Sequence, residues 1–285
     1  MVFFVLHAAP GDPVELMLGE QASGADREAL RESLGLHLPV WDQYITFVGG
    51  VFVGDWGQSI HHAQSVMALI SARIWETVYL AATSMLFALV FALPLGLWAA
   101  KNVGRWQDQC AMGVSLVGIS VPNFVLGPVM IWLFAVVLLW LPTGGNETPQ
   151  SVILPAIALG SALAAISARM IRSSVLQTMQ SAYIKTARAK GLSDNQVLWR
   201  HALRNAFLPV LTVLGLQLGM LLGGAVITEV VFQWPGIGTL MVEAIQTRDY
   251  PVVQGCMLVI SLAYVGVNLL TDLAYAQLDP RVRLG

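Results

Sequence analysis

The sequence predicts an all-α protein embedded in a lipid bilayer, on three observations. Of its 285 residues, 56% are hydrophobic and only 11% are charged, whereas a soluble domain carries about 25% charged residues. The mean hydropathy is +0.68. Apolar runs of about 20 residues, the length that a helix needs to cross a bilayer, recur along the chain. The formal net charge of −2 argues against a nucleic-acid partner, which would require a basic face.

Five apolar stretches are long enough to span: 74–100, 110–141, 152–171, 208–232 and 252–275. A sixth apolar piece, residues 1–9, is too short to span alone and ends in Pro10-Gly-Asp-Pro13, which stops a helix. We therefore expect residues 1–9 to be the remnant of a truncated first membrane helix, with five helices intact. A short interfacial segment is the alternative.

The distribution of basic residues predicts the orientation. If residues 10–73 lie outside, eleven of the fifteen Lys and Arg residues fall in inner segments, as the positive-inside rule requires. This gives an external, periplasmic segment 10–73, a membrane domain 74–277 with an inner loop 179–207, and a cytoplasmic tail 278–285. We expect a multi-pass protein of the bacterial inner membrane whose C-terminus is cytoplasmic. The apolar and aromatic stretch 43–53 is expected to lie along the membrane surface.

The inner loop is the most informative part of the chain. Its first half, from Tyr183, is basic and compatible with a helix, and Gly191 is a suitable C-terminal stop. Ser193 or Asp194 can cap a second short helix at 195–204. Two helices around a glycine would form a rigid protrusion, able to transmit force from a soluble partner. The alternative is an ordinary basic loop that only satisfies the positive-inside rule.

This loop resembles the signature loop of ABC-importer permeases, in the form carried by the dipeptide/oligopeptide/nickel family. The resemblance lies in Thr186-Ala-Arg-Ala-Lys-Gly191, Arg200-His-Ala-Leu-Arg-Asn-Ala206 and Leu208-Pro209. Relative to the general importer pattern, Lys185 replaces a Glu, His201 an Ile and Arg204 a Pro, and these departures belong to the peptide-type variant.

Further blocks resemble the same family in order and spacing: Pro10-Gly-Asp-Pro13, Gly54-Asp-Trp-Gly-Gln-Ser59, Gly118-Ile-Ser-Val-Pro-Asn-Phe124, Trp234-Pro-Gly-Ile-Gly238, Arg248-Asp-Tyr-Pro251 and Asp279-Pro-Arg281. The resemblance implies a type I permease bundle with six transmembrane helices in the full subunit. It also implies an ATPase-coupling role for the inner loop, at Thr186, Ala187, Arg188, Ala189, Lys190, Gly191, Arg200, His201, Leu203 and Arg204.

The partners implied by the resemblance are a second homologous permease, two cytoplasmic ATP-binding subunits that bind ATP with Mg²⁺, and an external substrate-binding protein. The sequence itself agrees on one point. Its only lysines are Lys101, Lys185 and Lys190, and none follows a glycine, so no phosphate-binding Gly-Lys-Ser/Thr motif is present. We expect no cofactor in this chain, and ATP hydrolysis in partner chains rather than here.

Residues of the transport path are predicted from polar or helix-breaking positions at membrane depth. Pro122 should break the helix around it, and the freed backbone groups must face protein or water, so Ser120, Pro122 and Asn123 are candidates, against a plain structural kink. Glu229 and the following Trp234-Pro235-Gly236 are candidates for an outer gate.

Three glycines, Gly215, Gly219 and Gly223, recur on one stripe of a predicted span. Small residues permit close helix approach, so we expect a packing seam against another membrane helix, for which a helix of the partner permease is a candidate. Local flexibility is the alternative.

The function predicted is passage of di- or oligopeptides across the inner membrane, driven by partner ATPases. Alternatives within the same machine are nickel, a metal chelate, glutathione or an opine. A secondary transporter that needs no ATPase is the alternative of another class, but no internal repeat supports it. His61-His62 lacks neighbouring ligands, so no metal site is expected.

Overall fold

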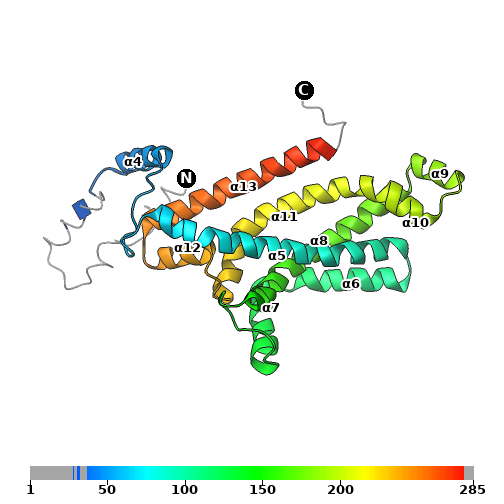
Figure 1. Ribbon diagram of the computed structural model, residues 1–285, viewed down its shortest axis with the longest axis horizontal. Helices are drawn as coiled ribbons and strands as arrows, with labels where there is room; N and C mark the ends of the chain where they lie inside the picture. The colour runs from blue at the N-terminus through cyan, green and yellow to red at the C-terminus, as the bar shows by residue number, and fades with distance from the viewer. Residues whose placement is uncertain (1–27, 29–30, 33–36, 279–285) are drawn as a thin grey trace. The chain divides into compact units, whose positions relative to one another are not determined.

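The computed structural model describes Glu28, Arg31, Glu32 and residues 37–278 (Figure 1). The described part of the chain is helical, with no strand beyond an isolated bridge between Gln58 and Ser65, which confirms the predicted all-α class. The expected remnant at 1–9 and nearly all of the tail 278–285 lie outside the described residues. The chain divides into two compact units, Met1–Thr77 with Pro235–Leu262 and Val78–Trp234 with Ala263–Gly285.

The first unit contains α4 (Val40–Val53), the start of α5 (Val66–Lys101), α12 (Ile237–Gln246) and the start of α13 (Tyr250–Leu278). Its core joins three of these helices and includes Val66, Ile70, Leu240 and Val252. The Ile237 N–H donates to Thr77 Oγ1 at 2.8 Å, so the first turn of α12 is fixed to α5.

The second unit is built around α8 (Ile153–Met179), which contacts α6 (Trp106–Ser120), α7 (Asn123–Met130) and α11 (Leu203–Val231). Helix α5 also packs closely on α8, because a Cβ at Gly160 would lie 2.7 Å from the Ser84 carbonyl oxygen. The basic segment, a name used below for residues 179–207, lies with α9 (Ala182–Ala189) at one end of α8 and α11 (Figure 1).

Three described stretches are long and apolar enough to cross a membrane: Val66–Lys101, Pro149–Met179 and Tyr250–Ala274. Two bent helix pairs raise the number to five if each pair counts as one span. These five positions correspond to the five predicted spans. The first span begins earlier than predicted, since α5 starts at Val66 rather than at residue 74.

The predicted span 110–141 is interrupted more strongly than expected. Helix α6 ends at Ser120, α7 begins at Asn123, and the two are bent by 96°. The cause is local, because proline lacks an N–H and disfavours helical conformation in the residue before it, and Val121 is accordingly extended at φ −91° and ψ 114°. Helix α7 then passes into a π-helix, η1 (Ile131–Val137).

Two further features depart from prediction. Helix α12 was not predicted, because its ten residues lie in a stretch that the sequence analysis treated only as a gate and loop. The second short helix, predicted at 195–204, does not stand alone. It forms as α10 (Asp194–Gln196) and a π-helix, η3 (Val197–Ala202), which leads directly into α11.

Candidate functional site

Gly191 ends α9 in the way that its sequence position predicts. Its φ is +84°, a left-handed conformation that glycine adopts without the steric cost of a Cβ. The Gly191 N–H donates to the Arg188 carbonyl at 2.9 Å. A Cβ built on Gly191 would meet nothing within 4 Å, so this turn presents an open surface within the chain.

Ser193 starts the second half of the basic segment. Its hydroxyl accepts from the Gln196 N–H at 3.4 Å, while the Ser193 N–H donates to Gln196 Oε1 at 3.0 Å, a reciprocal capping box. The π-helix η3 follows at once, and short π-helical insertions are frequent at functional sites. Local chemistry thus fixes the end of α9 at Gly191 and the start of α10 at Ser193.

The two halves of the basic segment share an apolar underside. Ile184 and Ala187 of α9 and Val197, Leu198 and Ala202 of η3 are buried in the core that α8 and α11 also supply. Leu192 and Leu203 pack against the same core and are partly buried. Because one side is held by this core, the opposite side is displayed as a fixed surface.

The displayed surface carries most of the predicted coupling residues. Thr186, Arg188, Ala189, Lys190, Gly191 and Arg200 are exposed, and His201 is partly buried. Ala187 faces the core instead, and the surroundings of Arg204 lie outside what the structure describes. Arg188 Nε lies 3.0 Å from Asp194 Oδ1, an exposed ion pair that links α9 to α10.

Sequence reasoning missed two aromatic residues of this segment. Trp199 is 58% exposed on η3, and tryptophan is enriched where membrane proteins meet the membrane–water interface. Tyr183 Oη accepts from Asn205 Nδ2 at 2.7 Å and lies 3.4 Å from the His201 carbonyl, so it ties α9 to the start of α11. The sequence signal that could have identified them is the presence of two aromatic residues in an otherwise basic loop.

The predicted path residues at the α6–α7 break lie near the surface. Ser120 and Pro122 are exposed, and Asn123 is partly buried as the first residue of α7. The Ser120 hydroxyl donates to the Leu116 carbonyl at 2.8 Å, within its own helix. The backbone groups that the α6–α7 break leaves without helical partners therefore lie next to exposed side chains, not inside the core.

The predicted gate residues are mostly buried. Glu229 is fully buried, and its carbonyl accepts from the Trp234 N–H at 2.8 Å. The Trp234 ring stacks on Tyr79 with centroids 6.2 Å apart. Pro235 is partly buried, and Gly236 is the buried residue that precedes α12.

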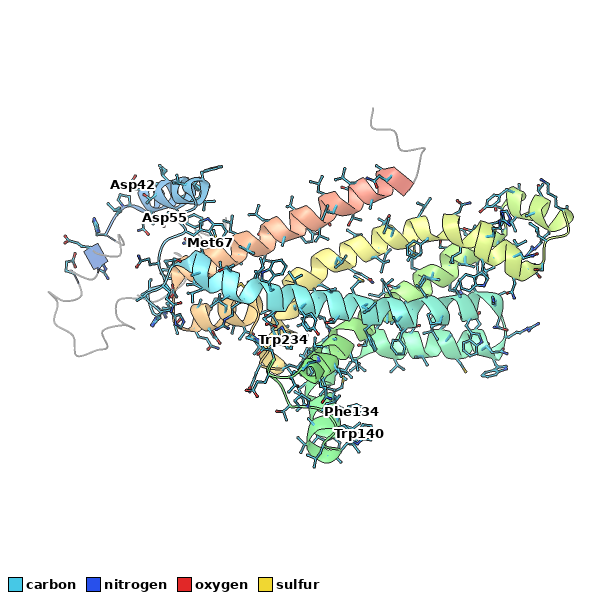
Figure 2. The ribbon with its side chains drawn as sticks, viewed as in Figure 1. Asp42, Asp55, Met67, Phe134, Trp140 and Trp234 are labelled. Atoms are coloured by element: carbon cyan, nitrogen blue, oxygen red, sulfur yellow. The ribbon has the colours of Figure 1, made fainter. Side chains whose placement is uncertain are left out.

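Helix α7, which begins at Asn123, contacts α11, which carries Glu229. A Cβ at Gly127 would lie 2.9 Å from Val231 Cγ1, and Phe232 is buried among Met130, Ala135 and Leu154. Phe134 packs against the same core, and its ring lies 6.1 Å, centroid to centroid, from that of Trp140 (Figure 2).

Gly215 and Gly219 of the glycine stripe on α11 pack against this chain's own α13. A Cβ at Gly215 would collide with the Thr271 side chain, and one at Gly219 would lie 2.8 Å from Tyr264 Cε2. The surroundings of Gly223 lie outside the described residues. On its other side α11 is bonded to α8, since Ser167 Oγ donates to Gln217 Oε1 at 3.0 Å.

The polar groups of the segment 54–65 form hydrogen bonds with other residues of the first unit. Ser59 Oγ donates to the buried Asp249 Oδ2 at 2.5 Å, and the His62 N–H donates to Ser59 Oγ at 2.9 Å. His61 Nε2 lies 2.7 Å from the Thr247 carbonyl oxygen. Within the described residues no group of three or more His, Cys, Asp or Glu could hold a metal ion.

Two family descriptions match this chain. Residues 92–284 match "Binding-protein-dependent transport system inner membrane component", and residues 1–81 match the N-terminal part of such membrane components. Together they cover the basic segment, the α6–α7 break and the segment 54–65.

Curated relatives agree with this match over nearly the whole chain. The glutathione transport system permease protein GsiC of Escherichia coli strain K12 is 41% identical over 283 residues, which cover 99% of this chain and 92% of the relative. The protein of the same name from Shigella dysenteriae serotype 1 gives the same identity and coverage.

Solved structures support the fold. The inward-facing MetNI methionine ABC transporter matches with a TM-score of 0.63 at 18% identity, covering 75% of this chain and 97% of the matched chain. An amino acid ABC transporter crystallised with histidines matches with a TM-score of 0.57 at 15% identity, covering 76% and 95%. At these identities the likeness concerns the fold alone.

Proposed function

Because the chain belongs to the inner membrane components of binding-protein-dependent transport systems, the permeases of ABC importers of the peptide/nickel type, we propose that it forms half of an ATP-driven path for a short peptide. A second, homologous permease forms the other half. Two ATPase subunits, which bind ATP with Mg²⁺, attach to the basic segment, and an external binding protein delivers the cargo.

The observation that carries this proposal is the basic segment itself. Its buried underside joins α8 and α11, and its exposed side offers Arg188, Lys190 and Arg200 around the open turn at Gly191. A surface that is charged, exposed and rigidly supported suits a protein partner with an acidic cleft. A solvated loop would need no such apolar underside.

The proposed orientation puts the basic segment and the C-terminus in the cytoplasm. Eleven of the fifteen Lys and Arg residues then lie on the inner side, in agreement with the positive-inside rule. The acidic segment 10–73 lies on the outer side, where the binding protein docks.

Glutathione is the cargo to test first, since it is named for relatives that share 41% of their residues over 99% of this chain. It is itself a short peptide, so it falls within the predicted cargo class. Within the described residues no metal-binding cluster supports nickel as the alternative.

The test is purification of the complex from the native host through this subunit, in lipid nanodiscs. We expect ATPase subunits and a second permease to co-purify, and ATP-dependent uptake of radiolabelled glutathione after reconstitution with the binding protein. The variant Gly191→Trp should lose the ATPases, because the added ring would occupy the open surface at this turn.

A matched control separates loss of docking from backbone strain. Gly145 has a φ of +78°, and a Cβ built there also meets nothing within 4 Å, so Gly145→Trp carries a similar strain in another loop. We expect Gly145→Trp to retain the ATPases. Recovery of the unmodified chain without any ATPase would overturn the proposal and favour a secondary transporter.

A further inference from the structure

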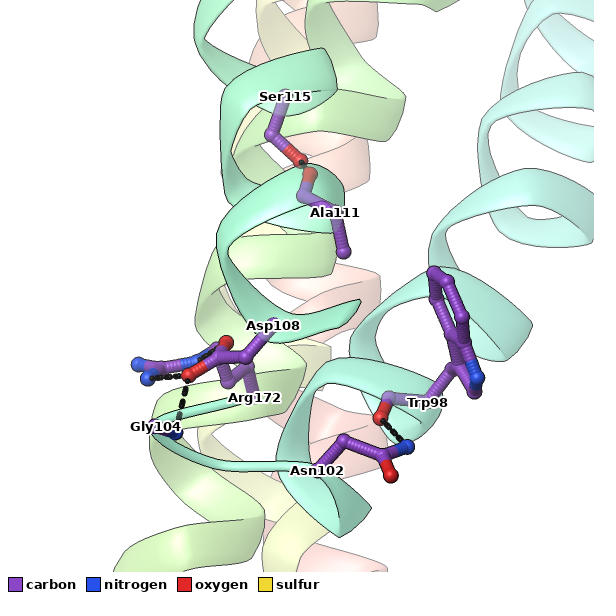
Figure 3. Close-up of polar contacts among 7 residues, drawn as sticks. All are labelled: Trp98, Asn102, Gly104, Asp108, Ala111, Ser115 and Arg172. Atoms are coloured by element: carbon purple, nitrogen blue, oxygen red, sulfur yellow. Dashed lines mark hydrogen bonds and ion pairs between the residues drawn. The ribbon is translucent and has the colours of Figure 1, made fainter. Parts of the chain in front are cut away.

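Asp108 and Arg172 form an ion pair between α6 and α8, away from every predicted site residue of the basic segment. Arg172 Nε lies 2.6 Å from Asp108 Oδ1, and a second guanidinium nitrogen, Nη2, lies 2.7 Å from Oδ2 (Figure 3). The side chain of Asp108 is 6% exposed and that of Arg172 27%. Paired, parallel hydrogen bonds of this kind fix orientation as well as distance.

The pair also fixes the turn between α5 and α6. The Gly104 N–H donates to Asp108 Oδ2 at 3.0 Å (Figure 3), and Gly104 has a φ of +77°. Asp108 lies in the first turn of α6, where a carboxylate is favoured by the helix dipole. A single carboxylate therefore holds the turn, the start of α6 and the side of α8 together.

Arg172 lies beside the contact between α8 and α11. Ser174 Oγ donates to the Ala206 carbonyl at 2.6 Å, and Ala206 belongs to the basic segment. The neighbouring Ile171 and Val175 are buried in the core that the basic segment shares. One short stretch of α8 is thus bonded to the basic segment on one side and to α6 on the other.

We propose that the Asp108–Arg172 pair positions α6 on α8, so that a movement of the basic segment reaches the α6–α7 break instead of being lost in the α5–α6 turn. The contacts run from Ala206 to Ser174, along α8 to Arg172, across to Asp108, and along α6 to Pro122 and Asn123. A rearrangement of η3 would move Ala206 directly, and with it the Ala206–Ser174 contact, because α11 continues from η3 without a break.

The inference rests on the proposed function, since it requires ATPases that move the basic segment. Coupling between two sites needs an element whose state both sites influence. The 96° break after α6 is the element that we assign this role.

The test uses the full complex in nanodiscs and a reporter that does not depend on cargo. The native Cys110 and Cys256 are replaced by serine, Asn123→Cys is introduced, and its maleimide labelling rate is measured without nucleotide and after vanadate trapping of ATP. We expect trapping to change the rate at least about fivefold in this background, and less than about twofold when Asp108→Asn or Arg172→Gln is added. ATP hydrolysis should persist in both variants.

Two further variants keep the test decisive. Asp108→Leu with Arg172→Met removes the directional bonds but leaves no unpaired charge, a replacement that folded proteins often tolerate, and it should lose the labelling response like the single variants. Arg73→Gln, which removes the Arg73–Glu243 ion pair at 3.6 Å, should keep it.

The outcomes separate the two proposals. An unchanged labelling response in variants that hydrolyse ATP overturns the role of the Asp108–Arg172 pair alone. An unmodified complex without bound ATPases overturns the proposed function, and this inference with it.

Discussion

Two polar segments of this protein, one in each compact unit, direct their charges in opposite ways. In the segment 54–65, Ser59 and the His61 N–H bond to the carboxylate of Asp249, which is 1% exposed. In the basic segment, Arg188, Lys190 and Arg200 face outward over a buried apolar layer. The segment 54–65 thus bonds to a carboxylate buried within the chain, whereas the basic segment exposes its charged side chains.

The difference bears on what each segment can do. The buried Asp249 carboxylate accepts hydrogen bonds from the Ser59 hydroxyl and from the His61 and Val252 N–H groups. It holds the backbone around it, and its loss would leave these three donors unpaired. Exposed charges contribute little to the stability of the chain that carries them, but they steer and orient a charged partner. We therefore expect variants in the first segment to act on stability and variants in the second on binding.

The largest effect is expected for Asp249→Ala. The change removes the acceptor of the Ser59 hydroxyl and of the His61 N–H, so the complex should lose about 2–3 kcal/mol of stability. Thermal unfolding in detergent measures this loss. The control Asp42→Ala, at an exposed position in the first turn of α4, should cost about 0.5 kcal/mol or less. Equal losses in the two variants would show that Asp249 does not hold this segment.

An intermediate effect is expected for Tyr183→Phe, which tests how the basic segment holds its own shape. Loss of the hydroxyl removes the acceptor for Asn205 Nδ2 and should cost about 1 kcal/mol, measured by thermal unfolding. Tyr264→Phe is a matched control, because Tyr264 is also 42% exposed and its hydroxyl makes no hydrogen bond within the described residues. If both variants unfold together with the unmodified protein, the Tyr183–Asn205 contact is not a support.

The smallest effect on stability is expected for Arg188→Gln. The Arg188–Asp194 pair is exposed, with 44% and 82% of the side chains accessible, so its loss should cost under about 0.5 kcal/mol. Affinity for the ATPase subunits should nevertheless fall about fivefold and become less sensitive to salt. Binding titrations at two salt concentrations measure this change, with Arg73→Gln as the control. A large loss of stability without loss of affinity would reverse the comparison.

Sequence reasoning predicted features that rest on local chemistry. The five apolar stretches, the helix stop at Gly191, the cap at Ser193 and the break at Pro122 follow from hydrophobic length, positive φ, side-chain capping and the missing proline N–H. Each of these features depends on a few neighbouring residues, so each could be predicted without knowledge of the tertiary contacts.

Features that depend on residues far apart could not be predicted in this way. The Asp108–Arg172 pair, the bond from Ser59 to Asp249 and the seam of Gly215 against Thr271 join positions on separate helices or loops. A charged residue in a chain gives no sign of which opposite charge it will meet. For the same reason the glycine stripe predicted a seam but did not identify α13 as its partner.

The sequence by itself determined that this protein is helical, lies in a membrane and carries a basic segment between two apolar stretches, because hydrophobic length, charge bias and turn chemistry act within short stretches of chain. The tertiary structure alone decided which face of the basic segment is exposed, and which polar side chains are paired and buried inside the fold. The physical reason is that burial and pairing are properties of packed helices, and packing brings together residues that the sequence keeps apart.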